Sequence, residues 1–566
     1  MTSAARSTPL TSAPQAALMF PMLNEAQLAR IAGHGVVRSV TRGDVLIESG
    51  QNDVPFFVVT AGELEIVRPS GLGDLVIAFH RPGQFTGEVS MLLGRPAMMR
   101  VRASESGEVI QLTRDQMHAL IQTDADVGEV VMRALVYRRL ALVSQGLGDA
   151  LLIGFASSAA TLRIRAFLTR NGHPFRYVDL DQDADVREIL DHFRVSEADL
   201  PVLICRDEAV LKNPSNQEVA HHLGFNRRID FARLRDVVIV GAGPSGLAAA
   251  VYAASEGLDA LVIEQDSPGG QAGSSSRIEN YLGFPTGISG QELAGRAYAQ
   301  VQKFGADVLI AKRAAELSGQ TPRCVRLDDG STIQAHAVII ATGARYRRPS
   351  LRALAQFEGA GVYYSATFME ATQLRDDDDV IVVGGGNSAG QAAIFLAQAG
   401  RVVHLLVRSR SVAESMSRYL IRRIEETPSI RMHTSTEVVA VQGTDHLERV
   451  QWRDGGGAVT THEIRHLFLM TGAEANTCWL KSRVVLDEKG FVKTGPDLTA
   501  DDLFAARWPL RRSPYLLETS LPGVFAVGDV RCGNVKRVAS AVGEGSIVMS
   551  LVHRVLAETA VKKECV

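Results

Sequence analysis

Short runs of β-branched and aromatic residues, separated by glycine-containing breaks, fill the chain from about Val36 to Leu112. Strands this short and this regularly spaced predict a small barrel or jelly roll. Apolar residues at helical spacing then predict a helical segment from about Arg114 to Gln145. The predicted strands include Asp44-Val-Leu-Ile, Pro55-Phe-Phe-Val-Val-Thr, Gly62-Glu-Leu-Glu-Ile-Val and Leu75-Val-Ile-Ala-Phe.

Between residue 150 and about residue 225 the pattern changes to alternating strands and helices. Helices are predicted from Ala159 to Asn171 and from Asn216 to Leu223, with one more before the third strand. This β-α-β-α-β-α order indicates a small α/β module. Its predicted strands are Leu151-Leu-Ile-Gly-Phe, Phe175-Arg-Tyr-Val-Asp-Leu and Asp199-Leu-Pro-Val-Leu-Ile-Cys.

A buried strand, Val237-Val-Ile-Val, runs directly into Gly241-Ala-Gly243-Pro-Ser-Gly246 and then into an alanine-rich helix. In such a G-x-G-x-x-G turn the glycines allow a close backbone approach, and the helix N-terminus faces a pyrophosphate. The next strand ends on Glu264, whose carboxylate can accept ribose hydroxyls. Strand, turn, helix and acid together predict a dinucleotide site.

The arrangement recurs after Val380-Ile-Val-Val, in the run Gly384-Gly-Gly386-Asn387-Ser388-Ala389. Here the following strand ends with Arg408-Ser-Arg410 and carries no acid. Arginine pairs with a 2′-phosphate that a carboxylate would repel, so this site is predicted to bind NADPH rather than NADH. Two such folds in one chain are typical of flavin–nicotinamide oxidoreductases, in which the second nucleotide delivers hydride to the flavin held by the first.

Length and charge limit the other possibilities. The 566 residues are enough for three or four domains, and a net charge of −3 gives no electrostatic reason to expect nucleic acid or a membrane as partner. No run reaches the roughly 18 apolar residues needed to cross a bilayer. The polar start, Met1 to Gln15, lacks the apolar core of a signal peptide. We therefore expect a cytoplasmic protein with a disordered lead-in.

The five cysteines are scattered, and no two stand at a C-x-x-C spacing. The sequence therefore predicts no zinc ribbon, no other metal site and no local dithiol.

The order and glycine spacing of the first region resemble a cyclic-nucleotide-binding domain, with Gly87-Glu88-Val89-Ser90 where that family's phosphate cassette begins. The resemblance implies that Glu88 accepts a ribose 2′-hydroxyl. The family's phosphate-pairing arginine falls on Ala97, and the flanking Arg95 and Arg100 are expected to project differently. Because a charge-assisted contact is missing, we favour a degenerate sensor or docking barrel over a true cyclic nucleotide receptor. Both interpretations stay open.

The following module resembles thioredoxin or glutaredoxin. The resemblance implies that Pro201 follows a cis peptide bond, a conformation confined in practice to X-Pro. Where the family carries its cysteines, this chain has Ala156-Ser157-Ser158-Ala159. We therefore expect a docking or spacing role rather than a redox role.

Roughly 330 C-terminal residues resemble thioredoxin reductase. The resemblance implies that Asp529 bonds the flavin ribityl chain, that Arg537-Val538-Ala539 lies along the isoalloxazine, and that the protein is a homodimer. It also implies an Ala341-Thr342-Gly343-Ala344 crossover strand and a return crossover ending at Gly472. The remaining implied flavin segments are Pro268-Gly269-Gly270-Gln271-Ala272, Ile278-Glu279-Asn280-Tyr281 and Pro522-Gly-Val-Phe-Ala-Val-Gly528.

One departure from that family changes the expected chemistry. Ser365 and Phe368 stand where the resemblance places the redox-active cysteine pair. Serine cannot cycle between thiol and disulfide, and phenylalanine offers no redox chemistry. Cys532, close to Asp529, and Cys565, at the tail, are the cysteines that could substitute, and a lone cysteine is more often a bystander.

These features predict a multidomain protein with an N-terminal β-barrel, a thioredoxin-like α/β module and two α/β Rossmann-like domains. The expected activity is hydride transfer from NADPH to FAD, with electrons passing to a non-disulfide acceptor such as a ferredoxin- or flavodoxin-like protein, a quinone or oxygen. A nucleotide- or redox-sensing regulator, and a thioredoxin reductase working through a tail cysteine, remain alternatives. The expected boundaries are 1–15 (lead-in), 16–147 (barrel), 148–230 (thioredoxin-like), 235–350 with 478–566 (FAD) and 351–477 (NADPH).

Overall fold

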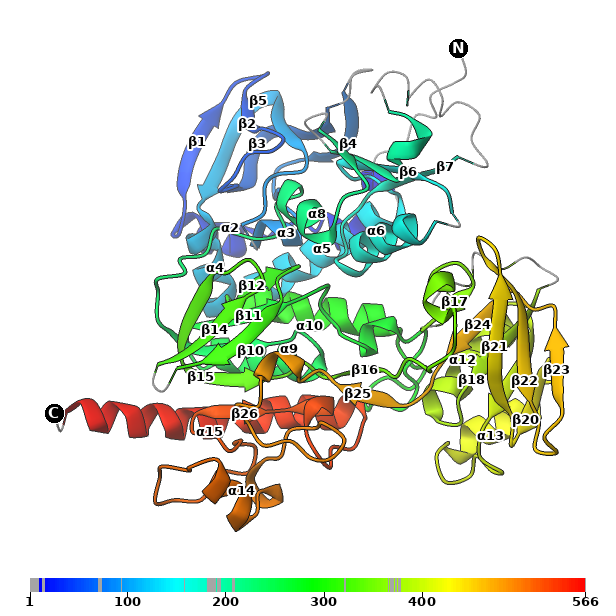
Figure 1. Cartoon of the computed structure of the whole chain (residues 1–566). Helices are drawn as coiled ribbons and strands as arrows, with labels where there is room; N and C mark the ends of the chain where they lie inside the picture. The colour runs from blue at the N-terminus through cyan, green and yellow to red at the C-terminus, as the bar shows by residue number, and fades with distance from the viewer. Residues whose placement is uncertain are drawn as a thin grey trace. The chain divides into compact units, whose positions relative to one another are not determined.

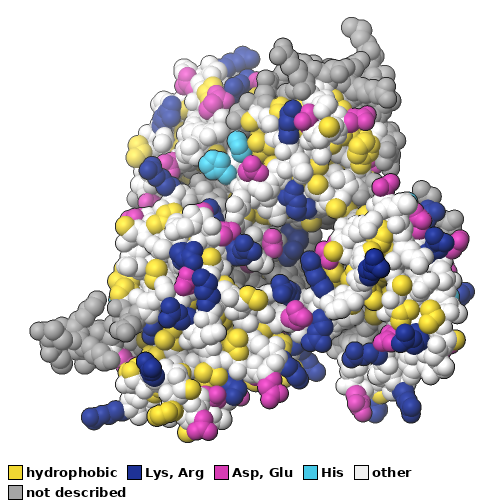
Figure 2. Space-filling view, viewed as in Figure 1, with side chains coloured by type: hydrophobic (Ala, Val, Ile, Leu, Met, Phe, Trp, Pro, Cys, Tyr) yellow, Lys and Arg dark blue, Asp and Glu magenta, His cyan; other side chains and the backbone are white. Residues whose placement is uncertain are grey.

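The computed structural model forms two compact units, which are Met1–Gly154 with Phe167–Asp230 and Ala299–Ala311, and Phe155–Ala166 with Phe231–Tyr298 and Lys312–Val566. No helix in the described part of the chain is long and apolar enough to cross a membrane. On the face seen in Figure 2, basic and acidic side chains are interspersed with hydrophobic ones. The structure describes residues 10–12, 16–69, 74–92, 94–156, 158–180, 190, 195–205, 209–319, 322–364, 366, 371, 374 and 378–564.

The predicted barrel is present in the first unit, with strand order β1-β5-β3-β4 and β2 paired to β5 (Figure 1). Two predicted strands are one continuous strand, β3, because Gly62 has a φ of 77° and the pairing with β5 shifts register around it. Alternation along the strands fills the barrel with apolar side chains, among them Phe57 and Leu64. The strands are β1 (Val36–Val40), β2 (Val45–Ile47), β3 (Phe56–Arg68), β4 (Leu75–His80) and β5 (Arg100–Leu112).

The helical segment after the barrel is broken at Asp124, where a single segment was predicted. Asp124 has extended backbone (φ −113°, ψ 97°), and its side chain accepts the N–H of Val127 at 3.0 Å. This N-cap ends α4 and begins α5. The helices of this part are α1 (Ala16–Met19), α2 (Glu25–Ala32), α3 (Val89–Leu92), α4 (Arg114–Thr123) and α5 (Ala125–Ser144).

The expected disordered lead-in is wrong for Leu10–Ser12. These residues form a 3-10 turn, η1, and Leu10 is buried because it packs in an apolar cluster with residues such as Phe20 and Ile77. The remaining residues of 1–15 lie outside the described residues.

The module after residue 148 contains a four-stranded mixed sheet of order β7-β6-β8-β9. Strand β7 is parallel to β6, whereas β8 and β9 run antiparallel to their neighbours. The cis Leu200–Pro201 bond is confirmed. The three-residue β9 was not predicted because it is too short to show alternation, and the middle predicted helix lies outside the described residues. The elements are β6 (Ala150–Gly154), α6 (Ala159–Arg170), β7 (Arg176–Asp179), η2 (Glu197–Asp199), β8 (Val202–Cys205), β9 (Val210–Lys212) and α8 (Asn216–His222).

The first dinucleotide fold is built on a seven-stranded sheet of order β12-β11-β10-β15-β14-β13, with β26 paired to β15. Strands β11, β15 and β26 run parallel to β10, as a nucleotide-binding sheet requires. Its elements are β10 (Arg235–Val240), α9 (Pro244–Ser255), β11 (Ala260–Glu264), η3 (Ala272–Ser274), α10 (Gly290–Phe304), β12 (Asp307–Ile310), β13 (Ala314–Ser318), β14 (Arg323–Leu327), β15 (Thr332–Ile340), β26 (Val524–Ala526), η7 (Gly528–Val530) and α15 (Val538–Glu564).

The second dinucleotide fold has a five-stranded parallel sheet of order β17-β24-β18-β19-β20 and a separate antiparallel sheet β21-β22-β23. A two-stranded ladder, β16 with β25, joins the two folds. The elements are β16 (Ala344–Tyr346), η4 (Leu354–Phe357), β17 (Val362–Tyr363), β18 (Asp379–Val383), α12 (Asn387–Gln398), β19 (Val402–Val407), α13 (Arg418–Glu425), β20 (Ile430–Thr434), β21 (Glu437–Gly443), β22 (Leu447–Arg453), β23 (Val459–His462), β24 (His466–Leu469), β25 (Ala473–Ala475), η5 (Cys478–Leu480), η6 (Gly495–Asp497) and α14 (Ala500–Ala505).

Candidate functional site

The first glycine turn leaves no room for side chains at two of its three glycines. Gly241 has a φ of 108°, and a Cβ added there would lie 2.4 Å from the carbonyl oxygen of Ala341. A Cβ on Gly246 would lie 1.9 Å from the carbonyl oxygen of Gly241. Helix α9 therefore packs on the turn at a distance that only glycine permits.

Gly243, the middle glycine of the turn, leaves space for a ligand. Gly243 is the N-cap of α9 without a side-chain cap, and a Cβ added to it would meet nothing within 4 Å. The first N–H groups of α9 are thus free to bind a pyrophosphate, which fits FAD. The predicted flavin segment lies against this turn, since Gly269 donates its N–H to the carbonyl oxygen of Ala242 at 2.7 Å and an added Cβ on Gly270 would be 3.1 Å from the Cα of Gly243.

Glu264 ends β11 where the sequence predicts the ribose-binding acid. Its side chain is buried and accepts the N–H of Ala242 at 2.7 Å and that of Asp266 at 2.8 Å. These bonds fix the carboxylate beside the glycine turn. A carboxylate has about four acceptor positions, so ribose hydroxyls can still be accepted.

The C-terminal flavin motif converges on the same turn. A Cβ on Gly528 would lie 2.6 Å from the hydroxyl oxygen of Ser245, and one on Gly545 would lie 2.3 Å from the Ser245 carbonyl oxygen. Helix α15 therefore packs on α9, and the predicted Arg537, Val538 and Ala539 stand at its start. Burial raises the pKa of Asp529, whose carboxyl can accept a hydrogen bond from a hydroxyl.

The crossover strands are joined by reciprocal hydrogen bonds. The Thr342 hydroxyl donates to the Asn476 carbonyl at 2.8 Å, and the Asn476 side-chain amide donates to the Thr342 carbonyl at 2.9 Å. The Gln271 amide donates to the carbonyl oxygen of Ala344. An added Cβ on Gly343 would meet nothing within 4 Å, so the crossover also leaves space.

The second glycine turn repeats the first one. Gly384 has a φ of 149°, and an added Cβ would lie 2.6 Å from the carbonyl oxygen of Met470. Gly386 is the N-cap of α12 without a side-chain cap, and Ala389 is buried at the third position. The Asn387 side-chain oxygen accepts the N–H and the hydroxyl of Ser417, both at 2.8 Å. This turn fits a second pyrophosphate.

Arg408 and Arg410 are exposed directly after β19 and make no hydrogen bond or ion pair with other described residues. The loop that follows them reaches the glycine turn, because the Ser415 hydroxyl donates to the carbonyl oxygen of Gly385 at 2.8 Å. Both guanidinium groups therefore remain available to a 2′-phosphate at the predicted site.

Replacing Arg408 and Arg410 together by alanine should raise the KM for NADPH roughly 10- to 100-fold, because charge-assisted bonds to a phosphate are lost. The KM for NADH should stay within about twofold, since NADH has no 2′-phosphate. Steady-state kinetics with both nucleotides measure this. Arg431→Ala, which removes an exposed arginine from β20, is the matched control. Equal losses with NADPH and NADH would contradict the assignment.

Two contacts near the sites were not found from the sequence. Tyr346, whose pKa burial raises, shares a side-chain hydrogen bond with Ser388. The Arg423 guanidinium bonds both carboxylate oxygens of Glu279, at 2.8 and 3.0 Å. The Tyr346 contact links the crossover to the second glycine turn. The sequence signal that could have revealed it was the position of Tyr346 just after the crossover. The second ties α13 to the segment that contains the predicted Asn280.

The predicted replacements Ser365 and Phe368, and the tail residue Cys565, lie outside the described residues. Cys532 is partly buried, and burial together with a hydrogen bond from its thiol to Asp487 raises the pKa of that thiol. A raised pKa lowers the thiolate fraction at neutral pH and makes Cys532 a poor nucleophile.

At about pH 8, an alkylating reagent should modify Cys532 several times more slowly than the exposed Cys478. The difference should narrow as the pH rises, because a thiol with a raised pKa gains thiolate only at higher pH. Mass spectrometry of peptides from the folded protein measures both rates. Faster modification of Cys532 would show an activated thiol beside the flavin motif.

The N-terminal cassette differs from the expected one. Glu88 pairs with Arg139 at 3.3 Å. Arg100 faces outward and pairs with Glu48 at 2.8 Å, whereas Arg95 is buried and lines a cavity inside the barrel domain. Ala97 also lines this cavity, so the expectation that Arg95 projects differently from Ala97 is wrong. Residues 94–97 precede strand β5, which begins at Arg100, so strand alternation does not apply to them.

Two family models match the chain. The model for pyridine nucleotide-disulphide oxidoreductases matches residues 235–545. The chain belongs to this family. The cyclic nucleotide-binding domain model matches residues 37–124, so a domain of that type precedes the two dinucleotide folds.

Thioredoxin reductases are among the similar proteins. The enzyme from Ureaplasma parvum serovar 3 is 32% identical over 315 residues, which are 55% of this chain and 94% of that protein. NADPH-dependent thioredoxin reductase 3 of Arabidopsis thaliana is 31% identical over 57% of this chain and 58% of its own length. The crystal structures of the Lactococcus lactis enzyme (FR conformation) and the T. acidophilum enzyme match with TM-scores of 0.51 and 0.50, at 25% and 28% identity, each over 57% of this chain and 99% of the other.

The chain is thus a thioredoxin reductase-like oxidoreductase with FAD and NADPH as its cofactors. The uncapped N-terminus of α9 and the space at Gly243 fit FAD, and the turn at Gly386 with the unpaired Arg408 and Arg410 fits NADPH.

Proposed function

We propose that this enzyme takes hydride from NADPH to FAD and passes the electrons to an acceptor other than a disulfide. A ferredoxin- or flavodoxin-like protein, a quinone and oxygen are the acceptors that suit this chemistry. The observation that carries the proposal is the sequence itself, with Ser365 and Phe368 where the related thioredoxin reductases are expected to carry cysteines. A hydroxyl cannot form or break a disulfide.

The residues of the chain have binding and positioning roles in this reaction. The N-termini of α9 and α12 hold the two pyrophosphates, and Glu264 orients a ribose. When bound, FAD supplies the ability to accept a hydride and release electrons singly or in pairs. Asp529 accepts a hydrogen bond from a flavin hydroxyl, which is the role that the resemblance implies for it.

Regulation is the second candidate. The cyclic nucleotide-binding domain favours a sensor in which ligand occupancy changes how the protein meets a partner, with little turnover. The strand order of the β6–β9 sheet supports our proposal that the next module is thioredoxin-like and serves docking or spacing. The homodimer stays a prediction.

Anaerobic NADPH should bleach the enzyme-bound flavin within seconds in a stopped-flow instrument, and readmitted oxygen or added quinone should restore the oxidised spectrum. An acceptor screen with thioredoxin, ferredoxin, quinones and oxygen, with and without cyclic AMP, then ranks the acceptors. A flavin that stays oxidised under NADPH contradicts the enzyme. Thioredoxin reduction that disappears in Cys565→Ser would instead support the tail-thiol alternative.

A further inference from the structure

The barrel domain contains a partly open cavity of about 100 Å³ whose wall is mostly apolar. Ile47, Ile77, Met98 and Val101 are among the buried side chains that line it. An apolar cavity of about 150 Å³ is known to hold a benzene molecule, so this one has room for a few carbon atoms.

Two arginines line the same cavity, and both are more than nine-tenths buried. Arg95 is 5% exposed, and its Nε and one Nη atom have no hydrogen-bond partner among the described residues. Arg138 is 4% exposed; its Nε donates to the Met19 carbonyl at 2.7 Å and its Nη1 to the Gly87 carbonyl at 2.8 Å, which leaves its Nη2 without a partner. Buried donors without acceptors cost roughly 1 to 3 kcal/mol each, and more when charged.

Among the described residues, no carboxylate is hydrogen-bonded to these donors. Glu88 lines the cavity but pairs with Arg139 at 3.3 Å, and Asp149 pairs with His173 at 2.9 Å. His80, the remaining ionisable group in the wall, is buried, and burial with the nearby Arg138 lowers its pKa well below the usual value, so it is neutral. The cavity therefore has excess positive charge and unused N–H groups beside an apolar space.

The guanidinium of Arg95 is held in a way that leaves its edge free. Its Cζ lies over the Phe225 ring, 4.6 Å from the ring centroid. The Nε and Nη atoms without partners belong to one planar guanidinium group. A carboxylate is the anion that matches such a planar edge.

We propose that this cavity binds a short-chain carboxylate of about three to five carbon atoms, with its carboxylate on Arg95 and Arg138 and its hydrocarbon part among the apolar side chains. The domain would then respond to a small apolar acid rather than to a cyclic nucleotide. The proposal concerns the N-terminal domain only and does not depend on the electron acceptor of the flavin.

Isothermal titration calorimetry of the full-length FAD-loaded protein tests this with butyrate, with butyramide and with cyclic AMP. Butyrate should bind, and butyramide, which has the same shape without the charge, should bind about tenfold more weakly or not at all. Equal binding of butyrate and butyramide, no binding of butyrate, or saturable binding of cyclic AMP that competes with butyrate would each overturn the proposal.

Variants locate the site. Arg95→Gln should weaken butyrate binding about tenfold, whereas Arg100→Gln, which removes an outward-facing arginine of the same segment, should leave it unchanged. Ala97→Leu fills the cavity without touching a charge and should also prevent binding. If Arg95→Gln does not fold, the Ala97→Leu result and the butyramide comparison decide. Unchanged binding in folded Arg95→Gln or in Ala97→Leu places the carboxylate elsewhere and contradicts the site.

Discussion

Gly246→Ala should abolish FAD binding, so that the purified protein is colourless. The single added Cβ would lie 1.9 Å from the carbonyl oxygen of Gly241 and 3.3 Å from the Cβ of Ala341. Because the nearest atom belongs to the backbone of the turn, no side-chain rotation relieves the overlap. Helix α9 must move away, and its N-terminal N–H groups then no longer face the pyrophosphate. The ratio of bound flavin to protein, measured by absorbance after desalting, checks this.

The control is Gly295→Ala in α10, where an added Cβ meets nothing within 4 Å. That variant should keep its flavin and gain up to about 1 kcal/mol of stability, because alanine favours helix more than glycine does. Circular dichroism of Gly246→Ala separates loss of FAD from general unfolding. A yellow Gly246→Ala protein with one flavin per chain would show that the turn binds no pyrophosphate.

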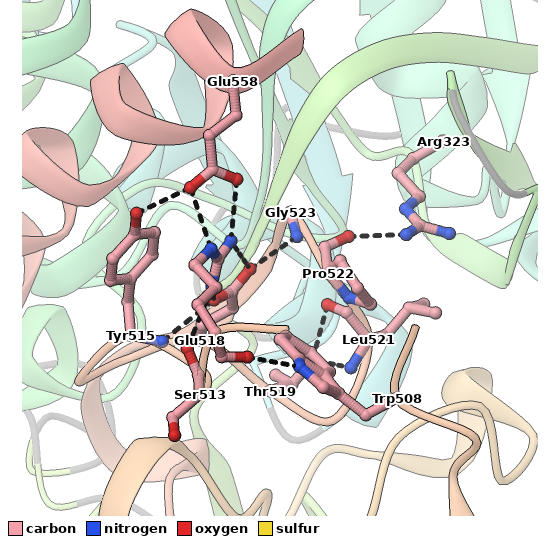
Figure 3. A network of polar contacts seen from close by, with 11 residues as sticks. Arg323, Trp508, Ser513, Tyr515, Glu518, Thr519, Leu521, Pro522, Gly523 and Glu558 are labelled. Atoms are coloured by element: carbon pink, nitrogen blue, oxygen red, sulfur yellow. Dashed lines mark hydrogen bonds and ion pairs between the residues drawn. The ribbon is translucent and has the colours of Figure 1, made fainter. Parts of the chain in front are cut away.

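Arg512→Ala should destabilise the FAD-binding fold by about 3 to 5 kcal/mol, because it leaves a buried carboxylate without its cation. Arg512 bonds both carboxylate oxygens of Glu518, at 2.6 and 3.1 Å, and its Nε bonds Glu558 of α15 at 2.8 Å. The Glu518 side chain is fully buried. Figure 3 shows Glu518, Glu558 and Tyr515 gathered around this network, next to the segment at Pro522 and Gly523 that leads into β26.

Urea unfolding followed by flavin fluorescence measures the effect, and Arg511→Ala, at the exposed neighbouring arginine, is the control. Adding Glu518→Gln to Arg512→Ala should restore part of the lost stability, because it removes the unpaired charge. Glu518 also accepts the N–H groups of Tyr515 and Gly523, both at 2.9 Å. If Arg512→Ala and Arg511→Ala have the same urea unfolding midpoint, the N–H groups of Tyr515 and Gly523 are enough to stabilise the buried Glu518 carboxylate.

The sequence predicted the elements whose signals are local. Both glycine turns, the acid at Glu264 and the arginines at 408 and 410 lie where their motifs placed them, because a glycine turn between a strand and a helix is specified by neighbouring residues. The same local reasoning missed the break at Asp124 and the short strand β9. An N-cap within an apolar pattern changes the hydrophobic periodicity too little to be detected in the sequence. The same holds for a strand of three residues.

Other features depended on contacts between residues that are distant in sequence and that the fold brings together. Arg512 and Glu558 are 46 residues apart in sequence, and Tyr346 shares a hydrogen bond with Ser388 of the second dinucleotide fold. Arg95 was expected to project differently from Ala97, yet the fold places both in the wall of one apolar cavity and buries Arg95.

The sequence by itself thus determined which cofactors the enzyme uses and that it carries no C-x-x-C pair, because nucleotide turns and cysteine spacing are written in consecutive residues. Only the tertiary structure decided which charges are buried, what pairs with them and where an empty space remains. Burial and pairing arise when segments distant in sequence pack together, and the local hydrophobic periodicity of the sequence carries no information on that packing.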